Sequence, residues 1–311
     1  MKTKAVGQIG LGSLGREFVP HLAEAFGALT VFDRDADRMA PLLSNRVKGA
    51  ASSREVGASS DIVILSLPDP DAVRAVLLGP DGVLADGVRC TLIIDTTTSD
   101  PKTVREMAAL AETRGIVYVE APVSTPIAGA PGPVAARTGD ATFLVGAEPG
   151  AFAAVEAVLS CLGRHIFHVG PVGHGSAIKL VTNYIAGATR MAIAEGFALA
   201  ASMGIPCART AEICQKAAAA SQTLEEVIAK VITGDLGEAG FSIDLRYKDF
   251  RLMSELGREM GVPMPIAAYC TEFYQMMRAR GMGGMDMNNM VPFVAELSGV
   301  DIFKGGRKRS A

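Results

Sequence analysis

Three glycines near the start of the chain have a spacing that could hold a phosphate group. They belong to the loop Gly10-Leu11-Gly12-Ser13-Leu14-Gly15, which directly follows a short apolar run. The first glycine permits a tight turn out of a strand, the second lets the backbone approach a pyrophosphate, and the third lets the following helix pack against the strand. That helix would offer its free N–H groups and positive dipole end to the phosphates. The loop therefore predicts a dinucleotide-binding site.

A carboxylate follows at the position where such a site would need one. The apolar run 29–32 ends on Asp33, close to the spacing of about 20 residues expected after the glycine loop. Asp33 can accept hydrogen bonds from the adenosine ribose hydroxyls and would repel a 2′-phosphate, which favours NAD over NADP. The adjacent Arg34 can stack on adenine or attract a phosphate, so the use of NADP stays open.

A lysine and an asparagine in the middle of the chain could also take part in chemistry. Lys179 and Asn183 are four residues apart, so they lie on one face of the helix predicted there and can point into the same cleft. Glu195 projects from nearly the opposite face, which argues against it as a partner of the lysine. From this segment alone, a solvated lysine on a helix face is an equally good interpretation.

The elements that position these residues alternate between strand and helix in the first half of the chain. We predict strands at residues 5–9, 29–32, 61–68, 91–95 and 116–120, and helices at residues 16–26, 71–78 and 101–114. This alternation predicts an α/β fold with a doubly wound, Rossmann-type parallel sheet, in which ligands bind at the carboxyl ends of the strands. A further βαβ-like stretch, residues 142–169, completes the predicted domain.

The second half of the chain has a different pattern. Strand signals vanish after Gly173, and a long helix over residues 176–202 leads an all-α domain and is expected to line the cleft between domains. We predict an NAD(P)-binding domain at 1–171, an all-α substrate and oligomerisation domain at 172–303, and a flexible basic tail at 304–311. Further helices are predicted at residues 207–220, 224–233, 248–260 and 266–280.

The composition restricts the classes of function. The 311 residues are 49% hydrophobic and 20% charged, which supports well-buried cores in a soluble, globular chain of two domains. The formal net charge of −3 provides no basic field, which argues against nucleic acid and anionic membranes as partners.

Other residue types argue against further classes. The five cysteines are widely scattered without a Cys-x-x-Cys pair, so a reduced, cytoplasmic setting fits best. We identify no signal peptide, and the most apolar later stretch, residues 185–203, is interrupted by Arg190 and Glu195, so no transmembrane span is expected. His165 and His168 have no third ligand nearby, so no metal site is expected.

Motifs spread over most of the chain resemble those of one enzyme family. In order they are the glycine loop, Leu67-Pro68, Asp95-Thr96-Thr97-Thr98, Glu120-Ala121-Pro122-Val123-Ser124, Gly173-x-Gly175 with Lys179 and Asn183, Tyr247-Lys248-Asp249, and Pro263-Met264-Pro265. The chain is identified by them as a member of the β-hydroxyacid dehydrogenase family, the group that contains 3-hydroxyisobutyrate dehydrogenase and tartronate semialdehyde reductase. Several ordered motifs are far more specific than any one of them.

The resemblance implies an activity and the residues that carry it. It implies a reversible, NAD(P)-linked interconversion of a small 3-hydroxy acid and its semialdehyde or keto form. Lys179 would be the general acid and base that moves the proton of the hydroxyl group. Asn183 would orient the substrate, and Ser124 would hydrogen-bond its hydroxyl or carboxylate. Family counterparts form dimers or tetramers, so a homodimer or homotetramer is expected.

The resemblance also implies further contacts with the cofactor. Leu67, Pro68 and Thr98 match family positions that contact its ribose and nicotinamide half. Lys248 matches a lysine that reaches the cofactor from the helical domain. The alternative for Lys248 is a surface residue that pairs with Asp249 or Asp244.

The chain departs from the family pattern next to Ser124. Two glycines, whose N–H groups hold a substrate carboxylate, normally follow this serine, whereas Thr125 and Pro126 stand here, and proline has no N–H to donate. The segment also carries about six extra residues compared with the family pattern. Either Gly132 takes the place of the second glycine after the insertion, or the acidic group of the substrate is held differently.

Two other functions remain as alternatives. Imine reductases share this architecture, but retention of Lys179 argues against that activity because those relatives usually carry another residue there. A catalytically silent nucleotide-binding module is the third possibility, and retention of Lys179, Asn183 and Ser124 argues against it.

Overall fold

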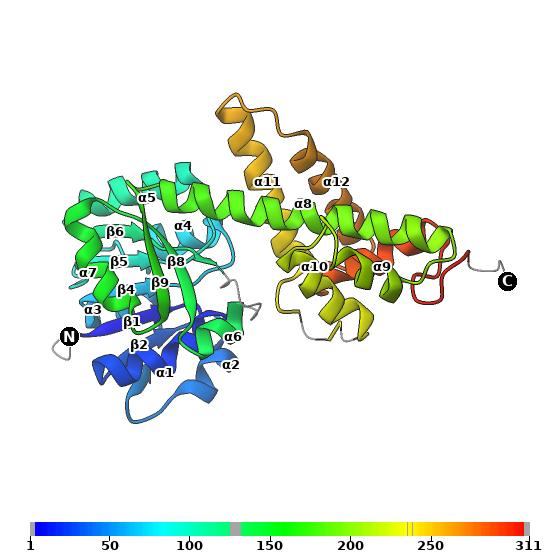
Figure 1. The fold of residues 1–311 in the computed structure, drawn as a ribbon. Helices are drawn as coiled ribbons and strands as arrows, with labels where there is room; N and C mark the ends of the chain where they lie inside the picture. The colour runs from blue at the N-terminus through cyan, green and yellow to red at the C-terminus, as the bar shows by residue number, and fades with distance from the viewer. Residues whose placement is uncertain (1–3, 125–131, 235, 238, 308–311) are drawn as a thin grey trace. The chain divides into compact units, whose positions relative to one another are not determined.

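The computed structural model describes residues 4–124, 132–234, 236–237 and 239–307 (Figure 1). The chain divides into two compact units, Met1–Leu180 and Val181–Ala311. Thr125 and Pro126 of the inserted loop lie outside the described residues, and Gly132 is the first residue of helix α6 (Gly132–Arg137).

The first unit alternates strands and helices along the chain (Figure 1). Its strands are β1 (Val6–Ile9), β2 (Leu29–Phe32), β3 (Val47–Gly49), β4 (Ile62–Leu65), β5 (Leu92–Asp95), β6 (Val117–Glu120), β7 (Val123–Ser124), β8 (Ala141–Gly146) and β9 (Gly163–Gly170). Its helices are α1 (Gly15–Phe26), α2 (Ala36–Met39), the 3₁₀-helix η1 (Ala40–Leu42), α3 (Ser53–Ser59), α4 (Pro70–Leu78), α5 (Pro101–Glu112), α6 and α7 (Pro149–Leu159). Every predicted element of this half is present.

The strands form one sheet in the order β3-β2-β1-β4-β5-β6-β8-β7, with β9 paired to β8. Strands β1 to β6 are all parallel to one another. The predicted doubly wound, Rossmann-type sheet is thus confirmed, but it is mixed, because β8 runs antiparallel to β6 and β7. The predicted βαβ stretch is β8-α7-β9, and its two strands are parallel.

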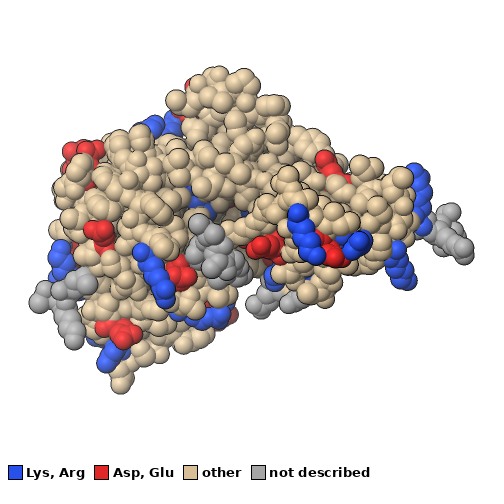
Figure 2. Space-filling view, in the orientation of Figure 1, with Lys and Arg blue, Asp and Glu red and all other residues tan. Residues whose placement is uncertain are grey.

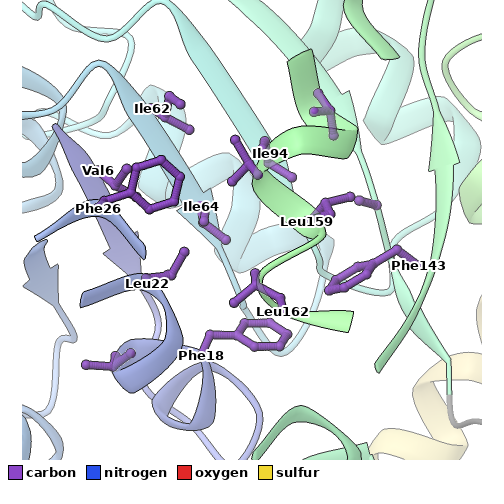
Figure 3. Packing of buried hydrophobic residues seen from close by; sticks show 14 of the residues in the cluster. Val6, Phe18, Leu22, Phe26, Ile62, Ile64, Ile94, Phe143, Leu159 and Leu162 are labelled. Atoms are coloured by element: carbon purple, nitrogen blue, oxygen red, sulfur yellow. The ribbon is translucent and has the colours of Figure 1, made fainter. Parts of the chain in front are cut away.

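Two hydrophobic cores lie on opposite faces of this sheet because successive side chains of a strand point to opposite sides. Ile62 and Ile64 of β4 pack with α1 and α7, as Figure 3 shows for Phe18 and Leu159. Val63 of the same strand packs with α3, α4 and α5. Each fully buried side chain of this size contributes about 1.5–3 kcal/mol to folding. A near-continuous apolar run such as that of β4 is therefore what a sheet covered on both faces requires.

The predicted long helix is α8 (His174–Ser202), and the elements after it are helical. They are α9 (Cys207–Cys214), α10 (Gln222–Val227), the π-helix η2 (Ile228–Ile232), α11 (Ile243–Glu259), α12 (Pro265–Ala279), the 3₁₀-helix η3 (Met287–Asn289) and α13 (Met290–Leu297). The helix predicted at 207–220 ends six residues early, and the alanines that follow are exposed. Alanine favours a helix, but without apolar burial this propensity does not sustain one.

Aromatic side chains hold α8, α11 and α12 together within the second unit. The rings of Phe250 and Tyr274 stack with centroids 5.7 Å apart. Gly187 of α8 faces Phe250, and a Cβ atom there would lie 2.7 Å from the ring. The absence of a side chain at Gly187 therefore permits the close approach of α11 to α8.

The described surface is of mixed charge. Figure 2 shows Lys and Arg side chains scattered among Asp and Glu on the face drawn, with other residues covering most of it. Among the described residues, no helix combines the length and the apolar character needed to cross a membrane.

Candidate functional site

The glycine loop has the geometry expected of a phosphate cradle. Gly10 has a φ of +88°, and a Cβ atom there would lie 2.3 Å from the carbonyl oxygen of Ser66. A Cβ atom on Gly15 would lie 2.0 Å from the carbonyl oxygen of Gly10. At Gly12 the nearest atom to such a Cβ is Nη1 of Arg38, at 3.8 Å. The fold itself thus requires the outer two glycines, whereas Gly12 borders the open space that a pyrophosphate needs.

Helix α1 begins directly after this loop. Leu14 is its N-cap residue, and the apolar side chain of Leu14 makes no capping hydrogen bond. The buried side chain of Gln8 holds the loop in place, because its Nε2 donates to the carbonyl oxygen of Gly10 at 3.2 Å and to Oγ of Ser66 at 3.1 Å. The N–H groups of Arg16 and Glu17 in this turn donate to the carbonyl oxygens of Gly12 and Leu14, so the start of α1 would attract an anion chiefly through the positive end of its dipole.

Asp33, at the end of β2, is fixed beside the loop. Its Oδ2 accepts a hydrogen bond from the N–H of Leu11 at 2.7 Å, and its Oδ1 accepts one from the N–H of Asp35 at 2.9 Å. Both Arg34 and Arg38 are exposed, but Nη1 of Arg38 lies 3.9 Å from Oδ2 of Asp33. The arginine beside the predicted ribose position is thus Arg38, which the sequence analysis missed because the path of the short helix α2 could not be predicted.

Hydrogen bonds connect the carboxyl ends of the neighbouring strands. Oγ of Ser66, after β4, lies 2.8 Å from Oγ1 of Thr96, after β5, and Oγ1 of Thr97 accepts from the N–H of Leu67 at 3.0 Å. These bonds tie together the two segments that carry three predicted cofactor contacts: Leu67, Pro68 and Thr98. Sequence reasoning included Thr96 in a motif but missed the buried Gln8 and the half-buried Ser66, although polar residues next to buried apolar runs were a usable signal.

Ser124 is the last residue of β7 and is half-buried. It pairs with Thr142 of the antiparallel strand β8. This pairing holds its backbone in the same sheet as the segments predicted to bind the cofactor.

Lys179 lies on α8 with 7% of its surface exposed. Lysine is almost never so buried without a partner or a role. Asn183 follows four residues later on the same helix and is half-buried. The alternative of a solvated surface lysine is therefore at odds with the burial of Lys179.

A buried carboxylate joins the two other polar site residues of the helical half. Oδ2 of Asp249 accepts a hydrogen bond from Nδ2 of Asn183 at 2.6 Å, and its Oδ1 lies 3.0 Å from Nζ of Lys248. The side chains of Lys248 and Asp249 are 12% and 3% exposed, so Lys248 has the predicted partner but is not a surface residue. The other predicted partner, Asp244, instead pairs with Arg278.

Two buried arginines form hydrogen bonds with residues of the second unit around Asn183. Nη1 of Arg246 donates to the backbone carbonyl oxygen of Asn183 at 2.9 Å. Arg190 is 1% exposed and donates to Oδ1 of Asn288 at 3.0 Å and to Glu226 at 2.7 Å. Burial lowers the pKa of Arg190 from its ordinary value. Neither arginine carried a sequence signal beyond an isolated charge on an apolar helix face.

The histidine pair has other contacts. His168 stacks on Phe152 and lies 2.8 Å from the carbonyl oxygen of Ala147 through its Nε2. Within the described part of the chain, no three His, Cys, Asp or Glu side chains are grouped to hold a metal ion.

Comparisons with known families match the two halves separately. Residues 5–170 match the family described as the NAD binding domain of 6-phosphogluconate dehydrogenase. Residues 173–294 match the family described as NAD-binding of NADP-dependent 3-hydroxyisobutyrate dehydrogenase.

Individual relatives align over almost the whole chain. The 2-(hydroxymethyl)glutarate dehydrogenase of Eubacterium barkeri is 33% identical over 305 residues, which cover 98% of this chain and 99% of that protein. The NAD-dependent L-serine dehydrogenase of Pseudomonas aeruginosa is 28% identical over 92% of this chain and 96% of its own. The structure of the Mycobacterium tuberculosis 3-hydroxyisobutyrate dehydrogenase with L-serine has a TM-score of 0.81 at 25% identity, covering 94% of this chain and 99% of that one.

Proposed function

The chain belongs to the β-hydroxyacid dehydrogenase family of NAD(P)-dependent enzymes that act on CH–OH groups, and from this premise we propose its substrate class and mechanism. It interconverts a small 3-hydroxy acid and the corresponding semialdehyde, with NAD as the preferred cofactor. Lys179 moves the proton of the reacting hydroxyl group.

The chemistry shared by the relatives supports the substrate class. The compounds in their names, 2-(hydroxymethyl)glutarate, L-serine and 3-hydroxyisobutyrate, each carry a hydroxymethyl group on the carbon next to a carboxylate. We propose the same 3-hydroxypropionate skeleton here, with a substituent at carbon 2.

The position of Asp33 supports the preference for NAD. Its carboxylate is anchored by Leu11 and Asp35 beside the glycine loop, where it can accept hydrogen bonds from ribose hydroxyls. A 2′-phosphate at that place would meet the negative charge. Arg38 offers the opposing attraction, so a lesser use of NADP is compatible with this geometry.

The observation that carries the mechanism is the burial of Lys179 on the same helix as Asn183. A bound nicotinamide ring would supply the acceptor and donor of hydride. During oxidation, Nζ of Lys179 as the neutral amine accepts the proton of the substrate hydroxyl, and during reduction the ammonium returns it to the carbonyl oxygen. Both directions need only this one proton-transferring group.

Three further side chains would orient the reactants. Asn183 hydrogen-bonds the substrate, and its bond to Asp249 fixes the orientation of its amide. Ser124 binds the hydroxyl or carboxylate of the substrate. Lys248 contacts the cofactor together with Leu67, Pro68 and Thr98. Such positioning supplies much of the rate enhancement of an enzyme whose redox chemistry belongs to the cofactor.

A substrate panel tests the proposal. The purified enzyme is mixed with NAD or NADP and each of 2-(hydroxymethyl)glutarate, L-serine and 3-hydroxyisobutyrate, and the reduced cofactor is followed by absorbance. Turnover of at least one compound with a higher kcat/KM for NAD supports the proposal. A parallel panel contains NADH or NADPH with the corresponding semialdehydes or with cyclic imines. Reduction of imines without turnover of hydroxy acids or semialdehydes would overturn the substrate class, and cofactor binding without any turnover would indicate a silent module.

A further inference from the structure

Strand β6 ends in a buried carboxylate that meets the beginning of α8. Glu120 is 1% exposed, and its Oε1 accepts hydrogen bonds from the N–H groups of Gly173 at 2.5 Å and Gly175 at 2.9 Å. Oγ of Ser176 donates to its Oε2 at 2.5 Å. Donors from the start of α8 thus converge on one side chain of the central sheet, and all of these residues belong to the first unit.

Glycines make room for this contact. A Cβ atom on Gly146, in the strand next to β6, would lie 2.0 Å from Oε1 of Glu120. A Cβ atom on Gly175 would lie 2.3 Å from the carbonyl oxygen of Leu144, and Gly173 has a φ of +98°. Gly146 therefore keeps a side chain away from the carboxylate on the sheet, and Gly175 lets the start of α8 approach strand β8 closely enough to reach it.

The contact is compatible with both protonation states of the carboxyl group. Burial raises the pKa of Glu120 to about 7, against the opposing effect of its hydrogen bonds. As a carboxylate, Glu120 accepts all three hydrogen bonds. As the neutral acid, it still accepts two through its carbonyl oxygen and can donate its own proton to Oγ of Ser176. Shape and acceptor capacity, rather than charge, hold the helix.

We propose that Glu120 is a positioning residue that fixes Lys179 by anchoring the first turns of α8. Lys179 lies three residues after Ser176, less than one helical turn away. The first N–H groups of a helix have no partner within the helix, so an unanchored end frays. Loss of the anchor would leave Lys179 on a fraying turn, where it could not hold the geometry that proton transfer demands. The inference rests on the proposed role of Lys179.

Two substitutions of Glu120 distinguish its role as a hydrogen-bond acceptor from the mere filling of space by its side chain. Glu120→Gln keeps the acceptor oxygen and a donor for Ser176, whereas Glu120→Leu fills a similar volume and leaves the donors without a partner. With 2-(hydroxymethyl)glutarate and NAD as the probe reaction, Glu120→Leu is expected to lower kcat by about 100-fold, with little change in the KM for NAD. Glu120→Gln should retain kcat close to the wild-type value. Glu156→Gln on α7, an exposed carboxylate, is the matched control.

Hydrogen–deuterium exchange provides a readout that needs no substrate. In Glu120→Leu the amides of residues 173–180 should exchange faster, whereas those of residues 190–200 on the same helix should keep wild-type protection. Glu120→Gln should match the wild type in both segments. Unchanged exchange of residues 173–180 in Glu120→Leu would overturn the anchor.

The double variant Glu120→Leu/Lys179→Ala links the anchor to the lysine. It should lose no more activity than Lys179→Ala alone, because Glu120 acts through that residue. A further large loss in the double variant would contradict the positioning role. If Lys179→Ala keeps wild-type turnover, the proposed function fails, while the exchange experiment still decides whether Glu120 anchors α8.

A milder pair of variants covers the case in which Glu120→Leu does not fold. Ser176→Ala removes only one of the donors, and Ser202→Ala near the other end of α8 is its control. Faster exchange of residues 173–180 and a lower kcat in Ser176→Ala alone would support the anchor. Identical behaviour of the two serine variants would contradict it.

Discussion

Asp249 accepts a hydrogen bond of 2.6 Å from the side-chain amide of Asn183, which joins α11 to α8 through two polar groups. Only 3% of the Asp249 side chain is exposed. A hydrogen bond to a buried carboxylate is stronger than one between neutral groups, and a partner left alone in such a place is costly. The orientation of Asn183 thus depends on a residue far away in the sequence.

Removal of this carboxylate should impair the reaction. In Asp249→Ala the Asn183 amide loses its partner, and we expect kcat/KM to fall by about 10- to 100-fold, the equivalent of one hydrogen bond to a charged group. Asp244→Ala on the same helix removes an exposed carboxylate and should leave steady-state kinetics unchanged. Equal kinetics of the two variants would show that Asp249 does not position Asn183.

The glycine loop allows binding and folding to be separated. Gly12→Ala should fold like the wild type, since only the end of the Arg38 side chain lies near the new atom, but its affinity for NAD should fall by at least about tenfold because the Cβ atom obstructs the pyrophosphate. Gly15→Ala should lower the free energy of unfolding by about 1–3 kcal/mol or more, because its Cβ atom would meet the carbonyl oxygen of Gly10. Thermal unfolding and NAD titration measure the two effects. Normal NAD affinity in Gly12→Ala would place the phosphates elsewhere.

Much of this site follows from local sequence patterns. Residue spacing and apolar periodicity determine the turn after β1, the end of β2 and the long helix α8, and both patterns are visible within short stretches of the sequence. The glycine loop, Asp33, and the helix that bears Lys179 and Asn183 could therefore be predicted.

Other features depend on contacts between distant residues or on very short elements. The strand β3 and the helix α3 contain too few apolar residues to show a period, and the antiparallel direction of β8 depends on the path of the chain before it. Neither the contact of Arg38 with Asp33 nor that of Glu120 with Ser176 has a local signal. In both cases only the tertiary structure brings the two partners together.

The choice of cofactor should respond to Asp33 and Arg38, the two charged residues beside the proposed ribose position. Asp33→Asn removes the repulsion of a 2′-phosphate, so the ratio of kcat/KM for NADP to that for NAD should rise by at least about tenfold. Arg38→Ala should lower that ratio, whereas the exposed Arg34→Ala should change it little. Steady-state kinetics with both cofactors measure the ratio. A larger effect of Arg34→Ala than of Arg38→Ala would contradict the assignment.

The buried carboxyl group of Glu120 should make the fold less stable as the pH rises. Its pKa is about 7 in the folded chain against an ordinary value of 4.5, so the folded state binds the proton more tightly than the unfolded state between these values. The stabilisation is complete below the lower pKa and should be lost as the pH rises through 7, by about 3 kcal/mol in total.

Glu120→Gln has no proton to lose at this position and should lack that part of the pH dependence. Urea unfolding of both proteins at about pH 5 and about pH 8 measures the difference. The stability of the wild type relative to the variant should fall between the two conditions. A parallel pH dependence of the two proteins would show that Glu120 titrates normally.

The proton-transfer role of Lys179 is tested most directly by single-turnover kinetics of Lys179→Ala with saturating NAD and 2-(hydroxymethyl)glutarate, next to Lys102→Ala as an exposed-lysine control. The rate of NADH formation should fall by about 10²- to 10⁴-fold in Lys179→Ala. Its dissociation constant for NAD and its thermal unfolding should stay at the wild-type values, and Lys102→Ala should resemble the wild type throughout. A Lys179→Ala enzyme that forms NADH at the wild-type rate would contradict the mechanism.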